Sequence, residues 1–126
     1  MSNVPDGLKY TKSHEWVRLE GDVATIGITD FAQSELGDVV FVELPNVGRV
    51  LGAGDSLGSV ESVKTVSDVY APIAGEVVEV NDALGSQSEL INTDPFGKGF
   101  MIKIKVQNAA DVDGLLSAGD YSGLIG

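Results

Sequence analysis

The sequence predicts a mainly β fold, a small barrel or sandwich with a few short helices. Sixteen glycines punctuate the 126-residue chain and separate short runs rich in Val and Ile, a pattern typical of compact all-β domains. The alternation is clearest where Ile102 and Ile104 face one side of an extended chain and Lys103 and Lys105 face the other. We expect strands over residues 14–19, 23–28, 39–44, 57–63, 66–71, 76–80 and 100–106.

A first short helix is expected over residues 30–36. Asp30 is a candidate N-cap, with Gln33 three residues further along the chain. Gly37 follows as a stop signal, because glycine adopts the left-handed conformation that ends many helices.

A second short helix is expected over residues 108–117, with Asn108 as its cap and a further helix at the C-terminus. Gly114 lies inside it and should weaken it by about 1 kcal/mol. Its apolar face would consist of Val112, Leu115 and Leu116. We expect residues 1–126 to form one domain, with the N-terminal 1–9 segment and the helical 108–126 segment packed on the β core.

The composition excludes several classes of function. There are 8 basic and 19 acidic residues, so the net charge is 8 − 19 = −11, which argues against binding to nucleic acid or anionic membranes. No cysteine occurs, which excludes disulfides, a thiolate nucleophile and Cys-ligated metal, and fits a reducing compartment. Residues 1–6 lack the features of a signal peptide. We expect a monomer in the bacterial cytoplasm or, alternatively, in the mitochondrial matrix after removal of a transit peptide.

Lys64 stands out because of its surroundings. Valines recur every three residues from 60 to 69, which fits neither one unbroken strand nor a helix. A strand, a turn near Lys64 and a second strand resolve this conflict, and a type I turn tolerates the residues present. Gly37–Val42 and Gly75–Val80 form a weak repeat with Lys64 between them, which suggests two similar β halves, although such strand entries are also common by chance.

Four blocks of sequence carry a family resemblance. "ESVKTVSDVYAPIAGEVVEVN" (61–81) surrounds Lys64, while "LKYTKSHEWV" (8–17), "GITDFAQSELGDVVFVELP" (27–45) and "INTDPFGKGFMIKIK" (91–105) follow the same order as in the family. Together they resemble the H protein of the glycine cleavage system, over nearly the whole chain. Biotin carriers instead flank their lysine with methionines, and the lipoyl domains of 2-oxo acid dehydrogenases usually carry Asp-Lys-Ala.

The resemblance implies a flattened barrel-sandwich hybrid of the biotinyl/lipoyl type with quasi-two-fold halves. It also implies a non-catalytic carrier with lipoic acid attached covalently to Lys64. Such a carrier takes the aminomethyl group of glycine from a pyridoxal-phosphate-dependent (PLP) glycine decarboxylase to a tetrahydrofolate-dependent aminomethyltransferase. Dihydrolipoamide dehydrogenase reoxidises it, and lipoate-attaching enzymes modify it.

The resemblance also assigns roles to residues around this lysine. The loaded arm of the family rests in a surface cleft, and by resemblance Ser13, Glu15 and Asp68 line it. They could equally be ordinary exposed residues, since the chain has many acids. The residues expected to form the hairpin or to be recognised by the attaching enzyme are Glu61, Ser62, Val63 and Thr65.

The remaining candidates are read as structural. His14 is the single histidine, and no partners for catalysis or metal binding can be identified in the sequence. Trp16, Phe31 and Phe41 are expected to be core aromatics. We expect no metal site.

Two positions depart from the family pattern. Thr65-Val66 stands where a pair of small residues is common, and Phe100 where Trp is frequent.

Two other functions stay open: an H-like protein that mainly relays lipoate or acts as a scaffold, and a small β enzyme. The second is disfavoured because no nucleophile–base pair, metal cluster or phosphate loop is evident.

Overall fold

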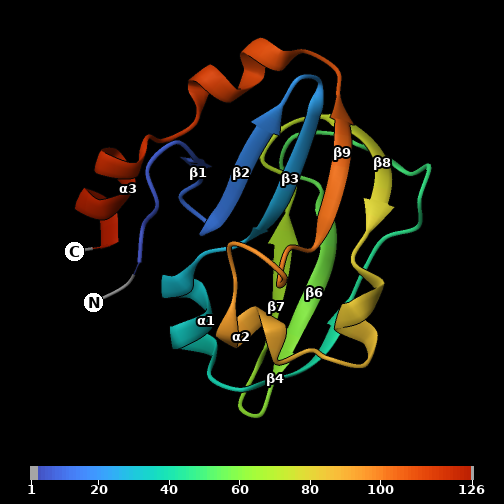
Figure 1. Ribbon diagram of the computed structural model, residues 1–126, viewed down its shortest axis with the longest axis vertical. Coiled ribbons are helices and arrows are strands. Elements are labelled where there is room, and N and C mark those ends of the chain that lie inside the picture. Colours follow the sequence, from blue (N-terminus) through green and yellow to red (C-terminus); the bar gives the residue numbers. More distant parts are fainter. Residues whose placement is uncertain (1–2, 126) are drawn as a thin grey trace.

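The computed structural model describes residues 3–125, which fold into two antiparallel sheets with short helices at their sides (Figure 1). The larger sheet has the strand order β1–β2–β3–β9–β8–β5, and the smaller has the order β4–β6–β7. This arrangement confirms the predicted mainly β, flattened sandwich. The strands are β1 (Lys9–Tyr10), β2 (Glu15–Glu20), β3 (Val23–Ile28), β4 (Val39–Glu43), β5 (Val50–Leu51), β6 (Ser56–Ser62), β7 (Val66–Tyr70), β8 (Gly75–Val80) and β9 (Ile102–Val106).

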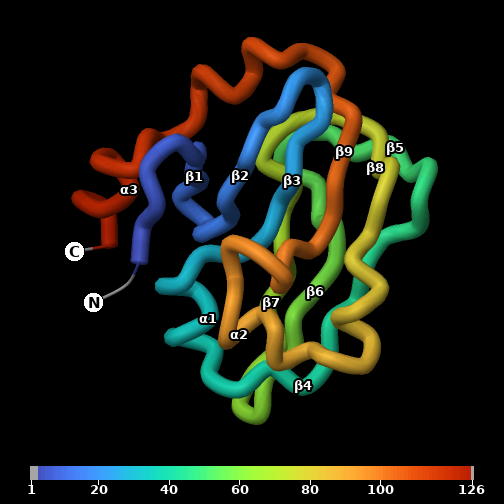
Figure 2. The backbone as a smooth tube through the Cα atoms, in the orientation of Figure 1, coloured from blue at the N-terminus to red at the C-terminus, as the bar shows by residue number. Residues whose placement is uncertain are grey.

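Every strand expected from the sequence is present, with ends that shift by at most two residues. The prediction missed the two-residue strands β1 and β5, which lie at the two edges of the larger sheet (Figure 2). It also missed the 3₁₀ helix η1 (Asp82–Gly85) and the single turn α2 (Leu90–Thr93). Elements this short contain no full period of apolar residues, so pattern reading cannot detect them.

Helix α1 (Asp30–Leu36) has the predicted bounds, but its cap is one residue earlier than expected. The N-cap is Thr29, whose hydroxyl oxygen accepts a hydrogen bond of 3.2 Å from the backbone N–H three residues further on. The prediction that Asp30 is the N-cap was therefore wrong, since Asp30 is already the first helical residue. Gly37 ends the helix with a φ of 82°, as predicted.

The helix predicted over residues 108–117 is wrong as one continuous element. The chain forms a 3₁₀ helix, η2 (Ala109–Gly114), and then extends before α3 (Ala118–Ile125) begins. In the extended part Leu116 exchanges two backbone hydrogen bonds of 2.8 Å with Tyr10. Pairing with β1 therefore replaces helical hydrogen bonds at this point, and the expected C-terminal helix starts only afterwards.

The apolar residues of this segment do not share one helical face, as had been predicted. Val112 and Leu115 pack on the main core, whereas Leu116 packs in a second cluster near α3. Asn108 does cap η2, because its side chain accepts a hydrogen bond of 3.1 Å from the backbone of Ala110.

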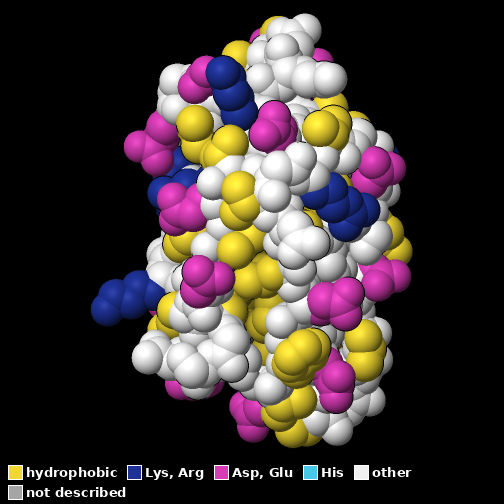
Figure 3. Space-filling model, turned by 90° about the vertical axis from the view of Figure 1, so that its right-hand side faces the viewer, with side chains coloured by type: hydrophobic (Ala, Val, Ile, Leu, Met, Phe, Trp, Pro, Cys, Tyr) yellow, Lys and Arg dark blue, Asp and Glu magenta, His cyan; other side chains and the backbone are white. Residues whose placement is uncertain are grey.

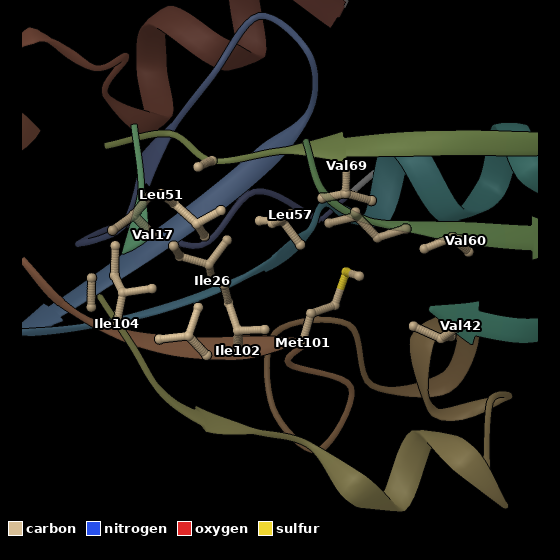
Figure 4. Close-up of a cluster of buried hydrophobic side chains, with 14 of the residues drawn as sticks. Val17, Ile26, Val42, Leu51, Leu57, Val60, Val69, Met101, Ile102 and Ile104 are labelled. Carbon is tan, nitrogen blue, oxygen red and sulfur yellow. The ribbon is translucent and has the colours of Figure 1, made fainter. Parts of the chain in front are cut away.

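The main core lies between the two sheets (Figure 4). Side chains of β3 and β9 point toward side chains of β6 and β7, and burying them from water stabilises the sandwich. The labelled members from these strands are Ile26, Ile102, Ile104, Leu57, Val60 and Val69, each at most 2% exposed.

The three aromatic residues predicted for the core have different environments. Trp16 is fully buried in the second cluster, with Tyr10 and Tyr121. Phe31 is only partly buried. Phe41 is 55% exposed, so its assignment to the core was wrong. Val42 points inward from β4, and the alternation of a strand turns its neighbour Phe41 outward.

The two copies of the weak repeat fall on β4 and β8, one in each sheet.

Acidic side chains are dispersed over the face shown in Figure 3 and form no single patch there. Among the described residues, no helix is long and apolar enough to cross a membrane.

Candidate functional site

Lys64 lies at the tip of the hairpin that joins β6 to β7, the yellow-green loop at the lower end of Figure 1. Its side chain is exposed. The backbone N–H of Ser62 donates to the carbonyl of Thr65 at 2.8 Å, and the N–H of Val63 donates to the carbonyl of Asp38 at 3.0 Å. The tip is therefore held both across the hairpin and to the segment between α1 and β4.

The buried hydroxyl of Ser62 organises this turn. Its oxygen accepts hydrogen bonds from the backbone N–H groups of Lys64 (3.3 Å) and Thr65 (3.2 Å). Neither Val63 nor Lys64 has a positive φ, which excludes type II and the primed turns and agrees with the predicted type I. Because neither central residue has a positive φ, the turn needs no Gly or Asn.

Ser62→Ala is expected to destabilise the protein by about 1–2 kcal/mol, because two backbone donors lose their acceptor. Amide hydrogen exchange at Lys64 and Thr65 should become faster, and chemical denaturation would measure the loss. Ser67→Ala is the matched control, since the exposed Ser67 hydroxyl makes only one long contact, 3.4 Å to the next carbonyl. Equal stability of the two variants would contradict the role assigned to Ser62.

The predicted recognition residues divide into two groups. Glu61, Val63 and Thr65 are exposed around Lys64, with Val63 70% exposed, so a modifying enzyme can reach them. Ser62 is 5% exposed, and its contacts are those of a hairpin residue.

A cavity of about 290 Å³ lies where the start of β2, helix α1 and the β6–β7 hairpin meet. The three residues predicted to line a cleft, Ser13, Glu15 and Asp68, all border it. We call it the cleft. The remaining residues that line it are His14, Ile28, Phe31, Ala32, Glu35, Leu36, Val60, Ser67 and Val69.

Lys64 lies near one end of the cleft. Its Cε atom is 3.6 Å from the position that a Cβ atom on Gly37 would occupy. Gly37 directly follows Leu36, which borders the cleft. A group attached to Lys64 would therefore start beside the end of α1 that forms one wall.

Glu15 is the most buried carboxyl group of the cleft, with an exposure of 2%. Its Oε1 accepts hydrogen bonds from the hydroxyls of Thr11 (2.7 Å) and Ser13 (2.6 Å), and its Oε2 accepts a longer one from the backbone N–H of Tyr70 (3.3 Å). Burial raises the pKa of Glu15, and these hydrogen bonds offset the rise only in part. Ser13 therefore both borders the cleft and helps to hold the Glu15 carboxyl group.

A family model described as "Glycine cleavage H-protein" matches residues 8–125. The chain belongs to the glycine cleavage H-protein family. It is 55% identical over 125 residues to the glycine cleavage system H protein of Carboxydothermus hydrogenoformans, covering 99% of this chain and 96% of the relative. The H protein of Symbiobacterium thermophilum is 58% identical over 121 residues, with 96% and 94% coverage.

A solved H-protein structure shares the fold. The crystal structure of a glycine cleavage system H protein from Mycobacterium marinum matches with a TM-score of 0.87 and 43% identity, over 95% of this chain and 97% of that one. Phe100 is half-buried and packs against the second cluster. The Lys103 ammonium lies 5.4 Å from the centroid of its ring. Phe100 is therefore a packing residue that does not border the cleft.

The charges that line the H-protein cleft favour a cation. Three carboxylate residues border it, Glu15, Glu35 and Asp68, and its lining residues include no Lys or Arg. Burial lowers the pKa of His14, although the negative charge of Glu35 opposes this effect, so a neutral imidazole is favoured. No group of three or more potential ligands among residues 3–125 is placed to hold a metal ion.

Sequence reasoning did not identify helix α1 as a wall of the cleft. Phe31, Ala32, Glu35 and Leu36 all border it, and their spacing of i, i+1, i+4 and i+5 places them on one face of a helix. That spacing was visible in the sequence, but nothing there indicated what the face of α1 meets.

Proposed function

We propose that this chain is a lipoyl carrier of the glycine cleavage system and that lipoic acid is attached through an amide bond to Lys64. The observation that carries the proposal is the position of Lys64. Its side chain is exposed at the tip of a hairpin and lies beside a cleft that is lined by carboxylates. The names of its relatives support membership of the same system.

The residues around Lys64 fit such a group. The side chain is exposed, the neighbouring Glu61, Val63 and Thr65 are accessible to a lipoate-attaching enzyme, and the chain has no cysteine to compete in thiol exchange. When bound, the lipoyl group supplies a disulfide that can be reduced while it takes up a carbon group. Acylation also removes the positive charge of the lysine.

The protein itself presents and shelters this arm and is not an enzyme in our proposal. The carboxylates of Glu15, Glu35 and Asp68 would attract the cationic amine of an aminomethyl cargo. Apolar residues from both walls, Ile28, Leu36 and Val69, would limit the access of water. Tethering also raises the effective concentration of the cargo at each partner.

The proposed partners are the PLP-dependent glycine decarboxylase, the aminomethyltransferase, dihydrolipoamide dehydrogenase and the lipoate-attaching enzymes. A bacterial cytoplasmic location is also part of the proposal, and the bacterial sources of the relatives support a bacterial origin. A monomer stays our prediction, based on the net charge of −11.

Intact-mass spectrometry on protein from lipoate-sufficient cells tests the attachment. We expect the mass increase of one lipoyl group in the wild-type protein and none in Lys64→Arg, which keeps the charge but cannot form the amide. Lys98→Arg is the matched control, because Lys98 is also exposed but lies outside the hairpin, and it should be lipoylated normally. An unmodified wild-type chain, or a modified Lys64→Arg chain, would overturn the proposal.

Glycine–bicarbonate exchange with the purified decarboxylase separates a carrier from a lipoate relay or scaffold. We expect exchange to require the lipoylated protein and to be absent with Lys64→Arg. A fully lipoylated protein that supports no exchange would instead indicate the relay function.

A further inference from the structure

One hydroxyl group joins the C-terminal helix to helix α1 and to the start of β2, which both border the cleft. Tyr121 of α3 is fully buried, and its hydroxyl oxygen lies 2.7 Å from the Oγ1 of Thr29 and 2.8 Å from the Nδ1 of His14. Thr29 is the N-cap of α1, whose residues form one wall. His14 lies between Ser13 and Glu15, which also border the cleft, and its backbone carbonyl accepts a hydrogen bond of 3.0 Å from the N–H of Thr29.

The hydrogen bonds of this group have a preferred direction. The hydroxyl oxygen of Thr29 already accepts from the backbone N–H of Ala32, so its own proton is free to be donated to Tyr121. Tyr121 can then donate to the Nδ1 of His14, which places the imidazole proton on Nε2. The reverse direction would leave the proton of the buried Thr29 hydroxyl without an acceptor, which is unfavourable.

The backbone of His14 adopts an unusual conformation. Its φ is 73°, and it is the only described residue other than glycine with a positive φ. This conformation costs roughly 1 kcal/mol or more for a residue with a Cβ atom. The hydroxyl of Tyr121 and the ring of Phe31, 4.9 Å away between centroids, hold the His14 side chain in place.

We propose that Tyr121 is a positioning residue: through its hydroxyl, the C-terminal helix fixes the side chains of His14 and Thr29 in the arrangement of the cleft that retains the cationic cargo. This inference rests on the carrier function proposed above. Tyr121 acts only through His14 and Thr29, because it is not among the residues that line the cleft.

Tyr121→Phe removes the hydroxyl and keeps a ring that can stack on Tyr10, whose centroid is 4.8 Å away at an interplanar angle of 9°. Tyr10→Phe is the matched control. It removes a buried hydroxyl from the same stacked pair, but that hydroxyl donates only to the carbonyl of Pro5, at 2.6 Å, away from the cleft. His14→Asn breaks the same link from its other end and suits the positive φ.

The first measurement uses the unlipoylated protein. Since His14 is the single histidine, ¹⁵N-histidine NMR gives the signals of one imidazole. We expect the Nε2–H tautomer in the wild type, and in Tyr121→Phe a changed tautomer ratio and a higher titration midpoint, because neutral Nδ1 loses its donor. Tyr10→Phe should match the wild type. An unchanged His14 titration in Tyr121→Phe would overturn the inference.

The second measurement uses fully lipoylated protein loaded by the decarboxylase, and follows loss of the cargo to water without aminomethyltransferase. We expect release to be several-fold faster from Tyr121→Phe and His14→Asn than from the wild type and Tyr10→Phe. Equal release from Tyr121→Phe and Tyr10→Phe would refute the positioning role. Failure of the wild type to become loaded would contradict the proposed function instead, whereas the His14 titration would still test whether Tyr121 positions His14.

Discussion

Gly58→Ala is expected to destabilise the protein by roughly 3 kcal/mol or more, at the upper end of what overpacking of a close contact causes. A Cβ atom on Gly58 would overlap with the carbonyl oxygen of Glu43 and lie 3.2 Å from its carbonyl carbon. This obstacle is the backbone of β4, which cannot rotate away as a side chain can. The end of β4 would therefore have to separate from β6, the strand that leads to Lys64.

Chemical and thermal denaturation would measure this effect, and for a domain of this size the melting temperature should fall by about 10 °C or more. Gly85→Ala is the matched control. Gly85 ends η1 with no atom within 4 Å of its added Cβ and no positive φ, so a change of at most about 0.5 kcal/mol is expected. A Gly58→Ala protein as stable as the Gly85→Ala protein would show that β4 can move without penalty.

The close approach at Gly58 illustrates what sequence patterns reveal about this fold and what they miss. Runs rich in Val and Ile between glycines predicted the long strands, and in the last strand the alternation of apolar residues supported this. Glycine was visible only as punctuation, whereas the need for it at Gly58 comes from the chain of β4 crossing at that point. The helix predicted over 108–117 was wrong for a similar reason: Leu116 pairs with Tyr10, more than a hundred positions away, and no local signal reports that pairing.

The candidate site, too, could be predicted only in part. The spacing of the valines around Lys64 predicted a turn there, and the family resemblance selected Ser13, Glu15 and Asp68, which the structure brings to one cavity. Neither source indicated Tyr121, because its hydroxyl meets Thr29 and His14 only after α3 packs beside β1. The role of the Ser62 hydroxyl in the turn could have been predicted, because serine side chains often form hydrogen bonds with nearby backbone groups.

The second large effect is expected for Glu15. In the unloaded protein, burial raises the pKa of Glu15 above its ordinary value of 4.5, so the folded state binds the proton more tightly than the unfolded chain does. Between the two pKa values the folded state holds more protons, and the free energy of unfolding should therefore fall as the pH rises across that window. Glu15→Gln has no such proton and should lack this decrease, which denaturation at several pH values would measure.

Glu15→Gln in the lipoylated, loaded protein is expected to accelerate release of the cargo by roughly 10- to 100-fold, since a hydrogen bond between charged groups contributes about 1.5–3 kcal/mol. Retention by the wild type should also weaken as the pH falls through the pKa of Glu15, because the carboxylate that attracts the amine becomes neutral. A bound cation favours the carboxylate, so this midpoint should lie below that of the unloaded protein. Glu76→Gln is the matched control, an exposed acid on β8 outside the cleft, and should release cargo like the wild type. Release from Glu15→Gln that is no faster than from Glu76→Gln would show that the position of Glu15 does not govern retention.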